Sequence, residues 1–218
     1  MVGCEQNHHH RHDVWNHTLD VIRLVPAESS LRWAALLHDA GKPGTRTISP
    51  GTEAQFHGHE ERSLALAAEL LERLKASHAL RKGVLALIRH HGTHPTAAWG
   101  DAACRRFLRR LAEDALELDR WAAFRLADQR GKGLEREARE AEHEAIVARL
   151  TALAASAPPL SVQDLALDGA ALMRLAGRPG GPWLGKLQRR LLEAVLEEPA
   201  LNTAAALAEL VQRWLPEC

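Results

Sequence analysis

Residues that favour α-helices dominate this sequence, and residues that favour β-strands are scarce. Alanine, leucine, arginine and glutamate make up the bulk of the chain, tyrosine is absent, and aromatic residues account for only 4%. Alanine and straight-chain side chains lose little conformational freedom in a helix, whereas strands favour β-branched and aromatic residues. We therefore expect an all-α fold, and the hydrophobic content of 46% is sufficient for a buried core.

Charge and cysteine usage exclude several classes of protein. Lysine plus arginine equals aspartate plus glutamate at 28 each, so no net positive field would attract nucleic acid or anionic lipid, and an RNA contact would need a local patch. Cys4, Cys104 and Cys218 are scattered and odd in number, which fits a reducing cytosol better than a disulfide framework. No stretch approaches the roughly 20 apolar residues that span a bilayer, so we expect a cytoplasmic protein without a membrane partner.

Apolar spacing, capping residues and helix breakers predict where the helices lie. Asp13 is a good N-cap for a first helix, and a second helix should begin at Ser29 or Ser30 and run into His38-Asp39. The segment 42–58 is rich in glycine, proline, threonine and serine and is expected to be an ordered covering loop. The helices expected in this part of the chain cover residues 14–24, 29–39, 59–75, 79–91, 102–112, 114–129 and 135–155.

The run Ala157-Pro158-Pro159 predicts a domain boundary, which divides the chain into residues 1–156 and 157–218. Beyond it, Ser161 and Asp164 have the spacing of a capping box, and Asp168 can cap a short helix that ends at Gly177. A turn over 178–182 and a helix over 184–196 should follow. We therefore expect a large helical domain with a smaller C-terminal helical appendage.

The most informative feature is where histidine and aspartate fall relative to the expected helices. Five separate elements each offer one or two metal ligands: His17, His38 with Asp39, His59, His90 with His91, and Asp128. Imidazole and carboxylate together suit Fe, Mn, Ni, Zn or Mg, whereas a structural zinc site would normally use cysteine. This donor set predicts a catalytic divalent metal, while His78 and His143 are interpreted as ordinary surface or core residues.

These residues stand in motifs that resemble a known family. The ordered segments LLHDAGK, FHGHEE, RHHG and LADQRGKG resemble the HD superfamily of metal-dependent phosphohydrolases. More narrowly, HDVWNHTL, LLHDAGKPGTRT and FHGHEE are similar to the HD domain attached to bacterial CCA-adding enzymes and poly(A)-polymerase-like tRNA nucleotidyltransferases. The segment from DLALDGAALMRL to EEPALNT is similar to the C-terminal helical region of those enzymes. The glycine-serine loop and paired aspartates of their nucleotidyltransferase head are missing, so we do not expect nucleotide addition.

The resemblance implies a helical bundle of the HD type that holds one or two divalent ions. The first ion would be bound by His17, His38, Asp39 and Asp128. The second ion would share Asp39 as a bridge and use His59 together with His91, or with His90 as the second choice. Mn, Ni, Co, Fe and Zn are the expected metals, with Mg as a further candidate.

The activity implied is hydrolysis of phosphomonoesters or 2′,3′-cyclic phosphodiesters of nucleotides or RNA ends by metal-activated water, as in a 2′-nucleotidase or phosphodiesterase. His38, Asp39 and Lys42 are the expected catalytic residues. The residues that could reach substrate phosphate are Lys42, Arg46, Arg130 and Lys132. A solvated surface charge is the alternative interpretation for each of these cations, and we favour it for the last three.

Two other functions stay open at this point. One is a tRNA-binding or RNA-binding module that partners a separate nucleotidyltransferase, with a mainly structural metal site. The other is a nucleotide triphosphate or dinucleotide hydrolase. A basic patch for RNA could be formed on one helix by Arg105, Arg106, Arg109 and Arg110. Nearby acidic residues dilute this patch, so a solvated helical face is the expected role.

Overall fold

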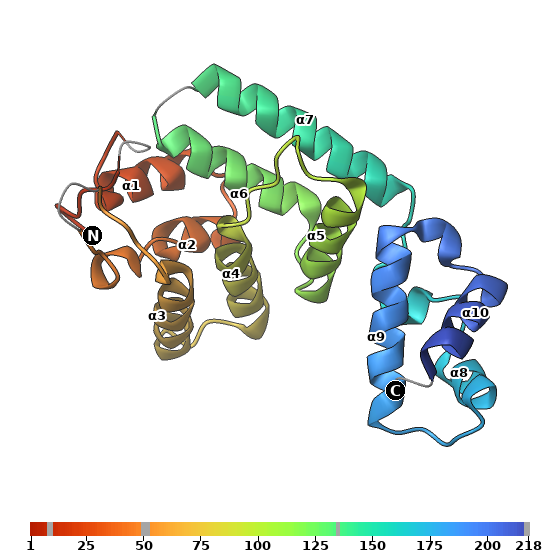
Figure 1. The fold of residues 1–218 in the computed structure, drawn as a ribbon. Coiled ribbons are helices and arrows are strands. Elements are labelled where there is room, and N and C mark those ends of the chain that lie inside the picture. Colours follow the sequence, from red (N-terminus) through yellow and green to blue (C-terminus); the bar gives the residue numbers. More distant parts are fainter. Residues whose placement is uncertain (8–10, 49–52, 134–135, 216–218) are drawn as a thin grey trace. The chain divides into compact units, whose positions relative to one another are not determined.

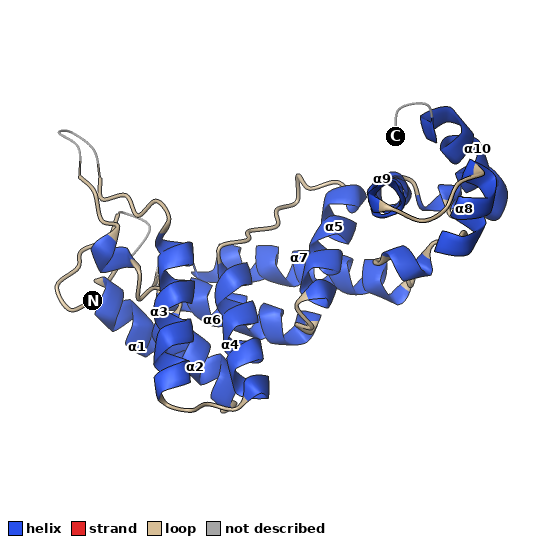
Figure 2. Ribbon diagram, turned by 90° about the horizontal axis from the view of Figure 1, so that it is seen from below, coloured by secondary structure: helices blue, strands red, loops and turns tan. Residues whose placement is uncertain are grey.

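The computed structural model describes residues 1–7, 11–48, 53–133 and 136–215, and these residues form an all-α fold (Figures 1 and 2). The described part of the chain contains ten α-helices and no β-strand beyond one isolated bridge between Thr47 and Gln55. The all-α prediction is therefore confirmed. Cys218 and the expected helix start at Glu135 lie outside the described residues.

The helices follow one another in the order labelled in Figure 1. They are α1 (Val14–Leu24), α2 (Ser29–Leu37), α3 (His59–Arg73), α4 (His78–His91), α5 (Asp101–Glu113), α6 (Leu118–Gly131), α7 (Arg136–Ala155), α8 (Gly169–Ala176), α9 (Pro182–Glu197) and α10 (Ala204–Trp214). Three short 3₁₀ helices are η1 (Lys42–Gly44), η2 (Val162–Asp164) and η3 (Pro199–Leu201).

The chain forms two compact units. Unit 1 comprises Met1–Ala97 and Leu111–Ala148, and unit 2 comprises Ala98–Arg110 and Arg149–Cys218. The division into 1–156 and 157–218 expected from the sequence stays a prediction. None of the helices in the described residues is long and apolar enough to cross a membrane.

In unit 1, α1, α2, α4 and α6 pack around a shared core, and α3 packs on α4 (Figure 1). Leu31 of α2, Leu87 of α4 and Phe124 of α6 are almost completely buried. Helices α1 and α6 approach each other closely at Gly131, where an added Cβ atom would lie 2.7 Å from Val21 Cγ2. Burial of these apolar faces fixes the helices that carry the expected metal ligands.

The predicted start of α1 is confirmed by a cap. The Asp13 carboxylate accepts a hydrogen bond of 2.8 Å from the Asn16 backbone N–H, which satisfies one of the unpaired donors at the helix start. The helix expected over 114–129 begins only at Leu118, since Ala115 adopts a left-handed φ of 51° that a continuing helix cannot accommodate. Lys75, with a φ of 52°, lies just beyond α3 for the same reason.

In unit 2, α8, α9 and α10 enclose their own apolar core. The fully buried residues of this core include Leu172, Leu187, Leu191, Val195, Leu207 and Val211. The predicted capping box of Ser161 and Asp164 is present at η2, and Asp168 caps α8 by accepting from the Ala171 N–H at 2.7 Å. Helix α10 is an element that the sequence prediction did not include.

Candidate metal centre

Side chains from five elements of unit 1 converge at one buried point. His17 lies in the middle of α1, His38 and Asp39 directly follow α2, and His59 is the first residue of α3. His91 is the last residue of α4, and Asp128 lies near the end of α6. These side chains are buried, except for His59, which is partly exposed. The packing of the helices therefore brings together the ligand set expected from the sequence.

The first group of metal-ligand atoms lies between α1, α2 and α6. His17 Nε2 is 3.1 Å from Asp128 Oδ1 and 3.7 Å from Asp39 Oδ2, while His38 Nε2 is 3.3 Å from Asp39 Oδ2. His38 Nε2 also lies 3.6 Å from Asp128 Oδ1. The ligand atoms of His17, His38 and Asp39 all lie within 4.8 Å of one another, which is close enough for a single ion to contact them.

The second group faces the other oxygen of Asp39. Asp39 Oδ1 is 3.5 Å from His59 Nε2 and 3.9 Å from His91 Nε2. These three residues again offer ligand atoms within 4.8 Å of one another. Since Oδ2 faces one group and Oδ1 the other, the Asp39 carboxylate could supply a ligand oxygen to an ion in either group.

Three of the histidines are oriented for metal binding by their backbone contacts. The Nδ1 atoms of His38, His59 and His91 lie 2.9, 2.8 and 2.6 Å from the carbonyl oxygens of Ala35, Phe56 and Ile88, respectively. A carbonyl oxygen can only accept, so each Nδ1 must donate, and a neutral ring then presents an unprotonated Nε2 to the centre. Metal-binding histidines are typically oriented in this way, so the donor set fits a divalent ion.

The carboxylates of the centre are ionised. Burial alone would raise the pKa of Asp39, but His38, Lys42 and His17 outweigh it and hold that pKa well below its usual value. Asp128 is likewise kept ionised, because Lys132, His17 and His38 outweigh the effect of burial on its pKa.

Two of the buried imidazoles of the centre, those of His38 and His91, differ in their charge. Burial lowers the pKa of His38, yet the charges of Asp39 and Asp128 prevail and raise it to about 10. The pKa of His91 is lowered to about 4 by burial and by the positive charge of His38. Without a metal His38 is therefore protonated on both ring nitrogens, and a bound cation would have to displace the proton on its Nε2 atom.

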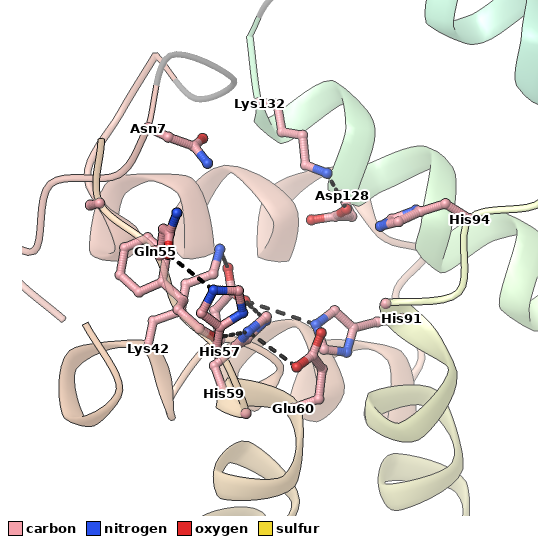
Figure 3. A pocket seen from close by; sticks show the side chains of 15 residues that line it. Asn7, Lys42, Gln55, His57, His59, Glu60, His91, His94, Asp128 and Lys132 are labelled. Carbon is pink, nitrogen blue, oxygen red and sulfur yellow. Dashed lines mark hydrogen bonds and ion pairs between the residues drawn. The ribbon is translucent and has the colours of Figure 1, made fainter. Parts of the chain in front are cut away.

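A cavity of about 430 Å³ opens onto this centre. Its lining includes the ligand residues Asp39, His59, His91 and Asp128 (Figure 3). Of the cations proposed for substrate binding, Lys42 and Lys132 line the cavity. Lys42 Nζ donates to Asp39 Oδ2 and to Gln6 Oε1, both at 2.7 Å, and Lys132 Nζ lies 3.2 Å from Asp128 Oδ2.

The other two proposed substrate cations are engaged elsewhere. Arg46 is exposed and donates to the Glu5 carbonyl at 3.2 Å, and Arg130 donates through two nitrogens to the Glu140 carboxylate. Neither residue is among those that line the cavity. Their contact with substrate stays a prediction without support from the shape of the cavity.

The adjacent histidines at the end of α4 face different partners. His91 Nε2 faces Asp39, whereas His90 Nε2 lies 2.7 Å from Asp114 Oδ2, and the His90 carbonyl accepts from the Trp121 indole N–H at 3.3 Å. Of the two, the geometry thus favours His91 as the ligand. His143 is buried and lies 2.8 Å from Arg125 through its Nδ1, in keeping with an ordinary structural role.

Several residues that line the cavity were not anticipated from the sequence. They are Asn7, Ala54, Gln55, Phe56, His57, Gly58, Glu60, Gly92 and His94. Most of them belong to the covering loop before α3 or to the segment after α4. The only sequence signal for them is their proximity to His59 and His91 in the chain.

Gly41 holds the loop after Asp39 against the start of α3. A Cβ atom at this position would collide with the His59 carbonyl oxygen and lie 2.8 Å from the Ser63 backbone nitrogen. Both are helix backbone atoms, so Gly41→Ala should displace His59 and lower the free energy of unfolding by about 1–3 kcal/mol. Urea unfolding measures this change. Gly100→Ala is the control, since a Cβ atom added at Gly100 would meet no atom within 4 Å, and equal stability of both variants would contradict the prediction.

Comparison with known proteins relates this helical chain to tRNA nucleotidyltransferases. The sequence profile of the family described as tRNA nucleotidyltransferase domain 2 matches residues 61–211. The chain belongs to this family. The match covers most of the chain and includes the residues from α3 into α10. This confirms the expected resemblance to tRNA nucleotidyltransferases, whereas the assignment to the HD phosphohydrolases stays a prediction.

Individual relatives of this chain carry names that fit the same family. An A-adding tRNA nucleotidyltransferase of Deinococcus radiodurans is 36% identical over 228 residues, covering 99% of this chain and 50% of the relative. A CC-adding tRNA nucleotidyltransferase of Thermus thermophilus is 35% identical over 205 residues, covering 90% of this chain and 44% of that enzyme. A multifunctional CCA protein of Azoarcus is 38% identical over 104 residues, covering 45% of this chain and 24% of that protein. The chain thus spans at most about half the length of these relatives, and no solved structure matches it.

Proposed function

We propose that this chain is a tRNA-handling helical part of the tRNA nucleotidyltransferase system and acts together with a nucleotide-adding domain. The observation that carries this proposal is the family match over residues 61–211. The alignment with the A-adding enzyme of Deinococcus radiodurans supports it, since nearly the whole chain corresponds to half of that enzyme. The nucleotide-adding domain can be a separate protein or another part of the same polypeptide.

Direct binding of tRNA tests this proposal. The chain should bind a tRNA transcript at least about tenfold more tightly than a single-stranded RNA of equal length at the same salt concentration, because nonspecific phosphate contacts alone give a Kd of about 10⁻⁴–10⁻⁶ M. Fluorescence anisotropy with end-labelled RNAs measures both values. Equal affinity for the two RNAs, or no binding of tRNA, would refute the tRNA-handling function.

A second function is proposed for unit 1, namely metal-dependent hydrolysis of phosphate esters on nucleotides or RNA ends. It is carried by the two imidazole and carboxylate groups that share Asp39 beside the 430 Å³ cavity. A divalent ion at such a site lowers the pKa of water from 15.7 towards about 7 and stabilises negative charge that develops on a phosphoryl oxygen.

Some residues of the centre would bind metal, and others would bind substrate. His17, His38, Asp39 and Asp128 would hold one ion, and Asp39, His59 and His91 the other. Lys42 and Lys132 place ammonium groups at the cavity, where they can neutralise phosphate oxygens. The Nδ1 hydrogen bonds keep the Nε2 atoms of His38, His59 and His91 directed at the centre.

A substrate screen of the metal-loaded chain tests the hydrolase function. We expect phosphate release from 2′-nucleotides, or opening of 2′,3′-cyclic ends, with added Mn, Ni, Co, Fe or Zn. Release of pyrophosphate from nucleoside triphosphates, or cleavage of dinucleotides, would instead assign the site to the triphosphate or dinucleotide hydrolases. If no phosphate ester were cleaved with any of these metals or with Mg, the centre would have a structural role.

A further inference from the structure

A strongly basic stretch in unit 2 takes no part in the candidate metal centre. No acidic residue occurs between Asp168 and Glu193, although the chain as a whole has as many acidic as basic residues. The same stretch contains five basic residues, Arg174, Arg178, Lys186, Arg189 and Arg190. The stretch includes all of α8, a turn rich in glycine and proline, and α9 up to residue 192, and its basic residues lie between the end of α8 and the middle of α9.

Helical spacing places part of this charge on one side of α9. Leu187 and Leu191 are fully buried and face the core of unit 2. Trp183, Lys186 and Arg190 follow one another at intervals of three and four residues on a different side, so they form a stripe along the helix. Lys186 and Arg190 are exposed and Trp183 is partly exposed. The first half of α9 therefore presents a basic stripe with an aromatic ring at its start.

Two arginines of this region are stacked on tryptophan rings. The Arg178 guanidinium lies 4.2 Å from the centre of the Trp183 ring, and the Arg190 guanidinium lies 4.3 Å from that of Trp214 in α10. The Trp183 indole N–H donates to the Pro179 carbonyl at 3.0 Å and so fixes the ring against the turn. Stacking orders the planar guanidinium groups while they keep their charge.

Lys186 and Arg189 carry the least constrained charge of the stretch. Both side chains are exposed, and neither has an ion pair with any described residue. Acidic neighbours begin only at Glu193, one turn further along α9. Neutralising these two cations should therefore change the surface potential without disturbing the fold.

Three of the four arginines of α5, namely Arg105, Arg106 and Arg109, serve a different purpose. Arg105 donates to the carbonyl oxygens of Leu196 and Glu197 at 2.6 and 2.9 Å. These hydrogen bonds satisfy two carbonyl groups that have no partner within the last turn of α9. Arg106 and Arg109 form ion pairs with Glu193, and Arg106 also pairs with Glu197. These arginines hold α5 against the second half of α9, so the simple solvated face expected from the sequence is wrong for them.

We infer that the basic and aromatic surface formed by Arg178, Trp183, Lys186, Arg189, Arg190 and Trp214, here called the α9 surface, binds the phosphate backbone of tRNA. The inference rests on the proposed tRNA-handling function and specifies the surface that would perform it. Lysine and arginine neutralise phosphates, and guanidinium planes and aromatic rings offer stacking faces to unpaired bases.

A lipid surface fits the α9 surface less well. A helix that lies on a membrane inserts a broad apolar face, and here the apolar face of α9 is already buried in the core of unit 2. The rings of Trp183 and Trp214 are covered in part by stacked guanidinium groups. Charge without an exposed apolar face favours a polyanion such as RNA.

The double variant Lys186→Gln/Arg189→Gln tests the α9 surface in the full chain. Its Kd for a tRNA transcript should rise about tenfold or more near 0.1 M salt, and the slope of log K against log salt should fall by about two, since each lost phosphate contact removes about one from the slope. Anisotropy titrations at four or more salt concentrations give both quantities. The melting temperature should stay within a few degrees of wild type, because both side chains are exposed.

The matched control is Arg73→Gln/Lys82→Gln, which removes the same charge from exposed positions in unit 1. If this control and the α9 variant bound tRNA equally well, the inference would be overturned while the tRNA-handling function survived. If the wild type failed to bind tRNA at all, both would fall. Binding of wild type to phosphatidylserine vesicles but not to RNA, lost in the α9 variant, would also overturn the inference in favour of a membrane surface.

Discussion

Asp39→Ala should remove most of the metal that the purified chain carries. The two oxygens of this carboxylate face two different histidine groups, so its loss removes a ligand from both. Metal affinity should fall by at least about a hundredfold, since even the loss of an outer partner of a ligand typically costs 10–100-fold. Elemental analysis of the purified protein and titration of the metal-free protein with Mn²⁺ provide the measurement.

Neighbouring histidines supply the control for this experiment. His91→Ala should weaken metal binding, whereas His90→Ala should preserve it, because His90 Nε2 faces Asp114 and not Asp39. The three consecutive histidines at positions 8–10 should be removed from every variant, so that binding to this run does not mask the result. Unchanged metal content in Asp39→Ala would place the metal elsewhere in the molecule.

The start of α1 was predictable, but the start of α6 was not. The limits of α1 follow from Asp13 as a cap and from the apolar spacing up to Leu24, and the structure has the same limits. The late start of α6 depends on the left-handed conformation of Ala115, which alanine adopts rarely and which its sequence does not signal. Tertiary packing determines whether such a turn forms.

Helix α10 was missed although its sequence contains the signal. Thr203 caps the helix by accepting from the Ala206 N–H at 3.2 Å. Leu207 and Val211 then follow at a spacing of four residues and are fully buried. This omission was avoidable, because a cap followed by apolar residues at helical spacing is the pattern that predicted α1.

That the residues of the candidate centre would lie together could be predicted because they stand in recognisable motifs, most of them at or near helix ends. The choice between His90 and His91 could not be derived from their spacing, since adjacent residues of a helix point about 100° apart and packing decides which one faces inward. The residues that line the cavity could not be predicted from the sequence either. Residues such as His57 and His94 lie in irregular segments, whose paths depend on contacts that local sequence does not encode.

The contacts of the basic residues could not be predicted from the sequence either. Arginines on α5 formed a visible group in the sequence, yet Glu193 and Glu197 pair with two of them from a position more than 80 residues further along the chain. The cations around α9 are more spread out in the sequence. They form a continuous surface only because the turn after α8 places Arg178 on Trp183 and α10 places Trp214 beside Arg190.

His38→Ala and Asp39→Ala should each abolish hydrolysis of whichever phosphate ester the wild type cleaves. Each change removes a ligand and thereby weakens both the activation of water and the stabilisation of charge on the phosphoryl group. The rate should fall by about a thousandfold or more, because several kcal/mol of transition-state stabilisation are at stake and each 1.36 kcal/mol is a factor of ten. Initial rates of phosphate release at saturating metal provide the measurement.

Two further variants separate metal binding from substrate binding and from general loss of structure. Lys132→Ala should raise KM while retaining measurable turnover, since Lys132 lines the cavity beside Asp128 and offers one phosphate contact. His143→Ala should leave kcat unchanged, because this buried histidine contacts Arg125 and does not line the cavity. If His38→Ala and Asp39→Ala hydrolysed the substrate as fast as His143→Ala does, the reaction would take place at another site. If the metal-loaded wild type cleaved nothing yet bound tRNA, the tRNA-handling function would stand alone.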